Sequence, residues 1–347
     1  MNKISLVVTV DYEVFGNGSG CVESCVLGPA RKILDIMNHY SAPLTLFADI
    51  PEFIAMETYK RPLVHEIKKQ LVETQLSGGD VQLHIHPQWY RAHHLFDDRW
   101  QLDMSKWRIA DQSTSVINHL IVASVDWLDA LFKEHSIDYE CYAFRAGGWC
   151  IQPSKELARI LIENGLRVDS SVAPGHVFRD SNEWYDFSVY PRDPYWRFSD
   201  DVCVSEEPGI WEFPITTGTV SKWSHLATLL RSRGSKGLAQ NCKGNYGGPS
   251  SKLKKVANRL EKLRRLGTVM LDISTLSVDQ MKQLSEQWLE KYIKKNKKIS
   301  LVAIGHTKNF SENSSRNFEK YLSWASANGI QFSTFKKVMK SVEYENG

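Results

Sequence analysis

The sequence predicts an α/β fold built on a mainly parallel sheet or barrel. Short apolar runs typical of buried strands alternate with longer segments whose apolar residues recur at helical spacing. Strands that alternate with helices favour parallel pairing. Polar residues capable of chemistry also follow the predicted strands repeatedly, and the active sites of parallel barrels lie at that carboxyl-terminal edge. The 347 residues are enough for one large domain.

The predicted strands begin with Ile4–Val10, a continuous apolar run of the kind that is buried on both faces. Val81–His84 follows the Gly78-Gly79 break and alternates apolar and polar residues. The remaining predicted strands are Leu44–Ala48, Cys141–Phe144, Arg167–Val172, Trp211–Pro214, Val269–Ile273, Ser300–Ile304 and Gln331–Thr334.

The predicted helices are identified by their spacing and end signals. Pro29–Tyr40 has proline in its first turn. Ser154–Asn164 has Ser154 as its cap and Gly165 as its stop. The other predicted helices are 62–76, Ser113–Phe132, Ser277–Lys294 and Ser315–Ala327.

One segment departs from this pattern, and we interpret it as a basic helical insertion at about 218–267 within a single domain of 1–347. Residues 222–265 hold twelve Lys or Arg and one acid, Glu261. Within it, Ser251–Leu266 is predicted to be a basic amphipathic helix. Such a helix is either a solvated face or a contact for phosphate, on a nucleotide- or lipid-linked sugar or an anionic membrane surface.

Composition narrows the function classes. The net charge of +3 lacks the strong positive excess of nucleic-acid-binding proteins. The aromatic motifs of common RNA modules are also absent, so no nucleic-acid partner is expected. Met1-Asn2-Lys3 leads directly into the first strand, and no apolar run approaches a membrane span. We therefore expect a soluble cytoplasmic protein, with the inner membrane surface as a second possible location. The six cysteines are irregularly spaced, so free thiols are expected.

Two pairs of polar residues indicate a metal site. His84 and His86 follow the alternation at Val81–Leu83, and Asp11 and Glu13 end the first strand. Residues two apart on a strand point to the same side. A histidine pair and a carboxylate pair at two strand ends suggest a divalent metal with a general base.

Five segments together resemble the polysaccharide deacetylase family, the NodB-homology group related to carbohydrate esterase family 4. Their order, each after a predicted strand, makes the resemblance specific, and it spans roughly residues 4–335. The segments are Thr9-Val-Asp11-Tyr-Glu13, Leu83-His-Ile-His86-Pro87, Phe144-Arg145-Ala-Gly-Gly-Trp149, Val168-Asp169-Ser170-Ser171-Val172 and Leu301-Val-Ala-Ile-Gly-His306.

The resemblance implies a distorted (β/α) barrel of about seven strands, a TIM-like fold, and a bound divalent metal. Glu13, His84 and His86 would be the metal ligands. Zinc suits two histidines and a carboxylate, and cobalt, nickel or iron would fit the same ligands. The family's second histidine lies four residues after the first, at a position that is Gln88 here. We assign that role to His86, with His93 or His94 as alternatives.

The resemblance also implies the reaction, which is hydrolysis of an N-acetyl group on an amino sugar. Asp11 would be the general base and His306 the general acid. Arg145 would pair with Asp11 and keep it ionised, and Asp169 would orient and charge His306.

The substrate would be a cell-surface polysaccharide or its intracellular precursor, and a role in polysaccharide biosynthesis follows. Two alternatives remain. The first is a deformylase or other amide hydrolase acting on a lipid- or nucleotide-linked sugar. The second is a non-catalytic sugar-binding relative. Trp89, Trp149 and Trp184 are either sugar platforms or core residues.

Overall fold

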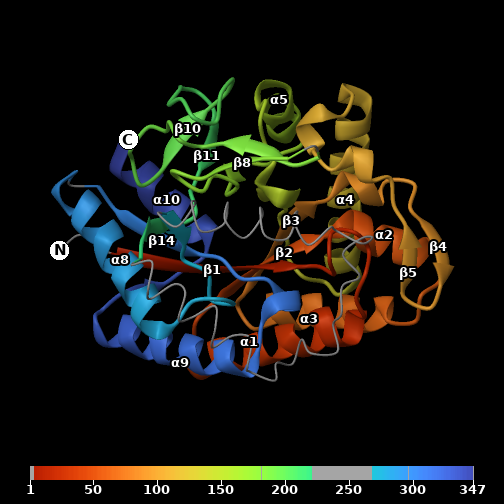
Figure 1. Cartoon of the computed structure of the whole chain (residues 1–347), viewed down its shortest axis with the longest axis horizontal. Coiled ribbons are helices and arrows are strands. Elements are labelled where there is room, and N and C mark those ends of the chain that lie inside the picture. Colours follow the sequence, from red (N-terminus) through yellow and green to blue (C-terminus); the bar gives the residue numbers. More distant parts are fainter. Residues whose placement is uncertain (1–3, 181, 221–267, 296, 347) are drawn as a thin grey trace, which may run out of the picture.

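The computed structural model of the chain describes residues 4–180, 182–220, 268–295 and 297–346 (Figure 1). The insertion predicted at about 218–267 therefore lies outside the described residues except for 218–220. The predicted helix Ser251–Leu266 and the phosphate or membrane contact through 222–265 lie outside them as well.

The core of the fold is one curled sheet. Its order is β10-β11-β7-β6-β3-β2-β1-β14, with β15 also pairing with β1. All neighbours pair in parallel except β10, which is antiparallel to β11. The strands are β1 (Ile4–Tyr12), β2 (Leu44–Asp49), β3 (Asp80–Ile85), β6 (Ala143–Ala146), β7 (Val168–Asp169), β10 (Trp196–Phe198), β11 (Ile210–Glu212), β14 (Ile299–Ala303) and β15 (Gln331–Phe332).

Irregular hydrogen bonds connect the chain beyond β11 to β14 at the other end of the sheet. The backbone N–H of Thr216 donates to the carbonyl of Val302 at 3.0 Å, and the N–H of Val302 donates to Thr216 Oγ1 at 2.9 Å. The N–H of Ile304 donates to the carbonyl of Leu271 at 2.9 Å. The fold is thus the predicted distorted barrel.

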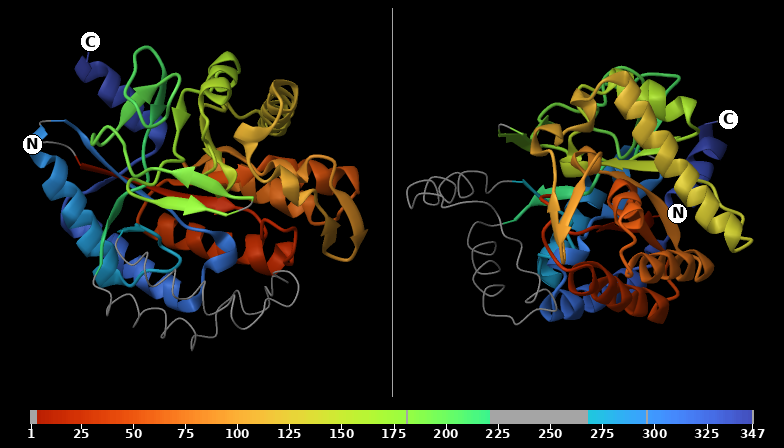
Figure 2. Two further views of the ribbon diagram at one scale, coloured as in Figure 1. Left: turned by 45° about the horizontal axis from the view of Figure 1, so that its top comes forward. Right: turned by 90° about the vertical axis from the view of Figure 1, so that its right-hand side faces the viewer.

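Helices cover the outside of the strands (Figure 2). Helix α9 packs against α1 and α8, while α4 packs against α2 and α5. A capping box formed by Ser277 and Gln280 starts α8, as expected from a serine at that position. The helices are α1 (Gly28–His39), α2 (Ile50–Thr58), α3 (Val64–Leu76), α4 (Thr114–Glu134), α5 (Lys155–Glu163), α8 (Val278–Tyr292), α9 (Glu312–Ala327) and α10 (Phe335–Asn346).

Short helical turns connect several of the strands and helices. They are η1 (Glu23–Leu27), η2 (Pro87–Trp89), η3 (Met104–Lys106), η4 (Ile109–Asp111), η5 (Gly147–Trp149), η7 (Ile293–Lys295) and η8 (Thr307–Asn309). Among the described residues, α4 alone is long and apolar enough to cross a membrane by length and composition, a test that the core helices of soluble proteins also pass.

Alternation along the strands divides the core into two clusters. On β1, Leu6, Val8 and Val10 belong to the larger cluster, whereas Val7 belongs to a smaller one with Phe47, Val302 and Phe335. The second cluster unites residues from six strands of the sheet with four residues of α10. We therefore place it inside the barrel, which α10 plugs at one end.

Several elements differ from the predictions. Val269–Ile273 was predicted as one strand, but the strand there is β13 (Thr268–Met270), which pairs antiparallel with β12 (Thr217–Thr219), and Asp272 forms only an isolated bridge with Ile304. Helices α2 and α10 were not predicted. Neither were the two-stranded pairs β4 (His93–Phe96) with β5 (Arg99–Gln101) and β8 (Val177–Arg179) with β9 (Trp184–Asp186).

The expectation of free thiols holds for Cys21, Cys141, Cys150 and Cys203. It is wrong for Cys25, which is in a disulfide.

Candidate metal centre and active site

Strand alternation brings the candidate residues together inside the barrel. On β1, Asp11 has the same parity as the interior residue Val7, and Glu13 continues that parity beyond the strand end. In the register of the sheet, His84 lies beside Asp49 of β2 on one side and beside Arg145 of β6 on the other. The polar side chains of this set are all buried: Asp11, Glu13, Asp49, His84 and Arg145.

Glu13, His84 and His86 form a buried cluster whose potential ligand atoms all lie within 4.8 Å of one another. Glu13 Oε2 lies 3.6 Å from His84 Nε2 and 2.9 Å from His86 Nδ1. Ligands about 2.0–2.2 Å from a tetrahedral metal lie roughly 3.4 Å apart. The 3.6 Å separation between Glu13 Oε2 and His84 Nε2 fits a small divalent cation.

Unsatisfied polar atoms give an independent test of this fit. His84 Nδ1 lies 2.9 Å from the carbonyl oxygen of Arg145 and must donate to it, because a carbonyl only accepts. This leaves the lone pair on Nε2, which is buried and has no hydrogen-bond partner. Glu13 Oε2, facing it, also has no hydrogen-bond partner. Two orphaned acceptors that face each other are what a cation site requires.

His86 is held by a carboxylate that the sequence analysis did not identify. Asp49 Oδ1 accepts the backbone N–H of His86 at 3.1 Å, and Asp49 Oδ2 lies 3.2 Å from His86 Nδ1. Burial alone would lower the pKa of His86, but Glu13 and Asp49 raise it to about 10. The imidazole of His86 therefore lies between two carboxylates.

The alternatives to His86 lie elsewhere. His93 and His94 belong to β4, where His93 Nδ1 lies 3.3 Å from the hydroxyl of Tyr59 and His94 packs against Trp100. Gln88, at the position of the family's second histidine, donates to the carbonyl of Gly16. The cluster therefore contains His86, as assigned.

Lys308 supplies a positive charge at the edge of the cluster. Its Nζ lies 2.6 Å from Glu13 Oε1 and 3.2 Å from the carbonyl oxygen of Val14. Burial alone would raise the pKa of Glu13, but His86 and Lys308 hold that pKa well below its usual range. Glu13 thus stays ionised, with Oε1 on Lys308 and Oε2 facing the histidines.

Asp11 is paired with Arg145, as expected. Arg145 Nη1 donates to Asp11 Oδ1 at 2.7 Å, and its Nε donates to the carbonyl of Ser170 at 2.8 Å. The guanidinium also lies over the ring of Phe47, 4.2 Å from the ring centroid. Burial would raise the pKa of Asp11, but Arg145, together with His84 and His306, lowers it. Asp11 is therefore an ionised carboxylate at neutral pH.

His306 lies across from Asp11, with Nε2 3.4 Å from Asp11 Oδ2. Its backbone N–H donates to Ser274 Oγ at 2.8 Å. Its Nδ1 is buried without a hydrogen-bond partner. Burial lowers the pKa of His306, and the negative charges of Asp11 and Asp272 oppose that shift.

The expected pairing of Asp169 with His306 is wrong. Asp169 instead accepts from Ser171, through the backbone N–H at 3.0 Å and the hydroxyl at 2.8 Å. It also shares a hydrogen bond with Glu212, its neighbour in the β7–β11 register. Burial and Asp169 raise the pKa of Glu212 well above its usual range. The two form a buried acid pair behind Arg145, and Asp272 is the carboxylate that acts on His306 in place of Asp169.

Sequence reasoning therefore missed Asp49, Asp272 and the contact of Lys308 with Glu13. A signal for Asp49 was present, because it directly follows the predicted strand Leu44–Ala48 and obeys the same strand-end rule as the residues that were chosen. Lys308 lies two residues after His306, but its pairing with Glu13 depends on the β1–β14 register. The sequence alone does not provide that register.

Two tryptophans adjoin the centre. The ring of Trp107 meets the edge of His86 at 5.7 Å between centroids, and Trp149 meets His306 in the same way at 5.9 Å. A Cβ on Gly148, whose φ is +58°, would lie 2.8 Å from Trp107 Nε1. Trp89 is buried core. Trp149 and Trp107 are half-buried.

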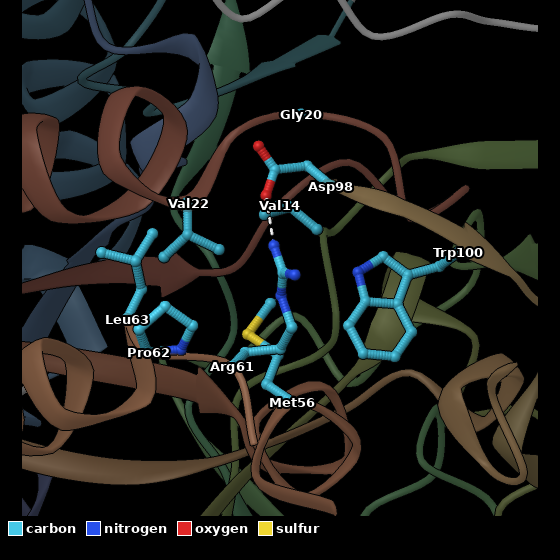
Figure 3. A pocket seen from close by; sticks show the side chains of 9 residues that line it. All are labelled: Val14, Gly20, Val22, Met56, Arg61, Pro62, Leu63, Asp98 and Trp100. Carbon is cyan, nitrogen blue, oxygen red and sulfur yellow. Dashed lines mark hydrogen bonds and ion pairs between the residues drawn. The ribbon is translucent and has the colours of Figure 1, made fainter. Parts of the chain in front are cut away.

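A small pocket lies next to this centre and is formed by other residues (Figure 3). An ion pair between Arg61 and Asp98, at 3.2 Å, lines it. The Val14 side chain points into it, while the Val14 carbonyl accepts from Lys308. The other lining residues are Gly20, Val22, Met56, Pro62, Leu63 and Trp100.

Comparison with known proteins identifies the fold. No family profile and no curated protein matches the chain. The solved structure of a proposed polysaccharide deacetylase from Mycobacterium smegmatis is similar over 100% of this chain and 92% of that one, with a TM-score of 0.55 and 11% identity. At that identity the similarity shows the fold alone, and the chain has the fold of the polysaccharide deacetylases, as its five motifs predicted.

Two further solved structures are more distant. The Puue allantoinase has a TM-score of 0.48 and 9% identity, covering 97% of this chain and 89% of that one. A carbohydrate esterase family 4 pseudoenzyme from Bacillus anthracis has a TM-score of 0.43 and 8% identity, covering 97% and 65%. Neither adds to the argument about this chain.

Proposed function

We propose that the protein is a metal-dependent hydrolase that removes an N-acetyl group from an amino sugar. One observation carries the proposal. A buried carboxylate kept ionised by Arg145, namely Asp11, lies between the Glu13, His84 and His86 cluster and His306. This proximity supports a base, a metal site and an acid acting together, the combination that metal-dependent amide hydrolysis uses.

A divalent metal, with zinc as the first candidate and cobalt, nickel or iron as others, would be held by Glu13, His84 and His86. When bound, it supplies Lewis acidity and lowers the pKa of water. The remaining chemistry belongs to the chain. Asp11 Oδ2 is the oxygen that Arg145 leaves uncovered, and it can accept a proton from the attacking water.

His306 is the proposed general acid. Its Nε2 lies 3.4 Å from Asp11 Oδ2, so a proton taken by Asp11 is close to the group that must deliver one to the leaving amine. The charges of Asp11 and Asp272 favour the protonated imidazole and oppose the effect of burial on its pKa. Arg145 serves as the positioning residue for Asp11.

The proposed substrate is an amino sugar of a cell-surface polysaccharide or of its intracellular, lipid- or nucleotide-linked precursor. The half-buried rings of Trp107 and Trp149 support this proposal, because sugar faces stack on aromatic rings. A formyl group would leave through the same tetrahedral species, so an acetylated and a formylated amino sugar belong in the same assay.

A second candidate function is non-catalytic sugar binding. The Lys308–Glu13 ion pair favours it, because a protein cation already balances the charge of one proposed ligand. Metal binding separates the two functions.

The first test is the metal content of the purified protein by elemental analysis, compared with His86→Ala and with the matched control His94→Ala. We expect about one metal per chain in the wild type and in His94→Ala, and loss of metal in His86→Ala. Hydrolysis of N-acetylated sugars should follow the metal content. A wild type that stays metal-free with added zinc or cobalt would favour the sugar-binding function.

A further inference from the structure

We propose that Asp49 is the positioning residue of the metal centre, fixing His86 as a ligand two residues after His84. This inference rests on the metal site of the proposed function. It adds a residue that lies outside all five family-like motifs.

The two oxygens of Asp49 divide their contacts between the backbone and the ring of His86. Oδ1 accepts the backbone N–H at 3.1 Å, and Oδ2 lies 3.2 Å from Nδ1. Asp49 itself is fully buried at the end of β2. His86 is thus held both at its backbone N–H and at its ring. Neither its backbone position nor the orientation of its ring is free to change.

The backbone contact matters because His86 lies just beyond its strand. β3 ends at Ile85, and the turn Pro87–Trp89 begins immediately after His86. Oδ1 of Asp49 therefore supplies an acceptor for His86 where strand pairing has ended. On the opposite side, a Cβ on Gly147 would lie 2.6 Å from His86 Cδ2, so the ring rests directly on the backbone there.

The ring contact determines which nitrogen of His86 carries the hydrogen. Nδ1 lies near both Asp49 Oδ2 and Glu13 Oε2, and it has one hydrogen to donate when the ring is neutral. When Nδ1 donates to Asp49, the lone pair of the neutral ring lies on Nε2, which is then the nitrogen available to a cation. A carboxylate that accepts the N–H of a ligating histidine fixes its tautomer and raises its basicity, and losing such a partner typically lowers metal affinity about 10–100-fold.

The test compares Asp49→Asn with Asp80→Asn, titrating the metal-free full-length proteins with Zn²⁺ by calorimetry. The amide introduced by Asp49→Asn keeps an oxygen for the backbone N–H of His86 but offers an N–H₂ group where Nδ1 needs an acceptor. Asp80 is a matched control, because it is also a buried aspartate. It begins strand β3, and His86 follows the other end of that strand. We expect Asp49→Asn to weaken Zn²⁺ binding about 10–100-fold and Asp80→Asn to leave it unchanged.

Co²⁺ absorption provides a readout that general destabilisation would not change. The visible spectrum of bound Co²⁺ should change in Asp49→Asn and match the wild type in Asp80→Asn. In a His86→Ala background, Asp49→Asn should cause no further loss of affinity, because Asp49 acts through His86.

The outcomes are distinguishable. Wild-type affinity and an unchanged cobalt spectrum in Asp49→Asn would overturn the role of Asp49 and leave the metal centre intact. Additive losses in the double variant would also overturn it. A wild type that binds neither metal would overturn the metal centre and this inference together.

Discussion

At the scale of single residues, a substitution of Asp11 tests the proposed general base separately from the proposed metal site. The Asp11→Asn change keeps the size of the side chain and an oxygen for Arg145, but the resulting amide cannot take a proton. We expect Asp11→Asn to retain metal and to lose activity by about 10²–10⁴-fold, the usual contribution of a general base. Elemental analysis and an N-deacetylation assay on the same preparation measure both properties. Loss of metal in this variant would make Asp11 a ligand and contradict its assignment as the base.

Residue assignments differed in how far the sequence could predict them. Residues two apart in extended backbone share a face whatever the tertiary fold, and His86 continues the extended backbone just beyond β3, so its pairing with His84 was predictable. The Asp169 pairing failed because it required knowing which strand lies next to β7. β11 provides Glu212 at that register position, and Asp272, which follows β13, forms a bridge with Ile304 close to His306.

At the scale of elements, β3 carries His84 near one end and a buried acid, Asp80, at the other. The Tyr142 hydroxyl donates to Asp80 Oδ2, and Gln82 Nε2 donates to Asp80 Oδ1 at 2.7 Å. Burial raises the pKa of Asp80 to about 6, above its ordinary value of 3.8. The native state therefore favours the neutral carboxyl more than the unfolded state does.

This shift predicts a pH-dependent stability. The stabilisation from a neutral Asp80 is fully present below about pH 3.8 and is lost as the pH rises through about 6. Relative to Asp80→Asn, the wild type should lose about 2–3 kcal/mol of unfolding free energy between pH 4 and 7. Urea denaturation of both proteins across this range measures it. A difference that stays flat, or that grows with pH, would contradict the raised pKa.

Helices were predicted correctly where the sequence carries a clear start signal. They were missed where only contacts in the folded protein distinguish a helix from a strand or explain its apolar face. Pro29 and Ser154 marked helix starts that the structure places at α1 and α5 to within a few residues. α2 was missed because it follows β2 without a loop, so its first residues look like a continuation of the strand. α10 was missed because its apolar face is explained only by the barrel interior that it plugs, where Phe335 packs against Phe47.

At the scale of the whole molecule, the pairing of β14 with β1 brings His306 next to Asp11, and a separate seam closes the barrel. Asp11 at the end of β1 and His306 after β14 form an isolated parallel bridge, and the N–H of Asp11 donates to the carbonyl of Gly305 at 2.9 Å. β14 is in turn tied to the other end of the sheet through Thr216 and Val302. The barrel is therefore closed by a seam made of a few irregular hydrogen bonds.

Thr216 is the residue at which this seam can be tested. It is fully buried, and its Oγ1 accepts the N–H of Val302 at 2.9 Å. Thr216→Val keeps the shape but leaves that N–H buried without a partner, which should cost about 1–3 kcal/mol of unfolding free energy. Thr45→Val is the matched control, because Thr45 is equally buried on β2 and its Oγ1 has no hydrogen-bond partner. Urea denaturation should show a clear loss for Thr216→Val and little or none for Thr45→Val, whereas equal losses would mean that the Thr216 hydroxyl does not hold the seam.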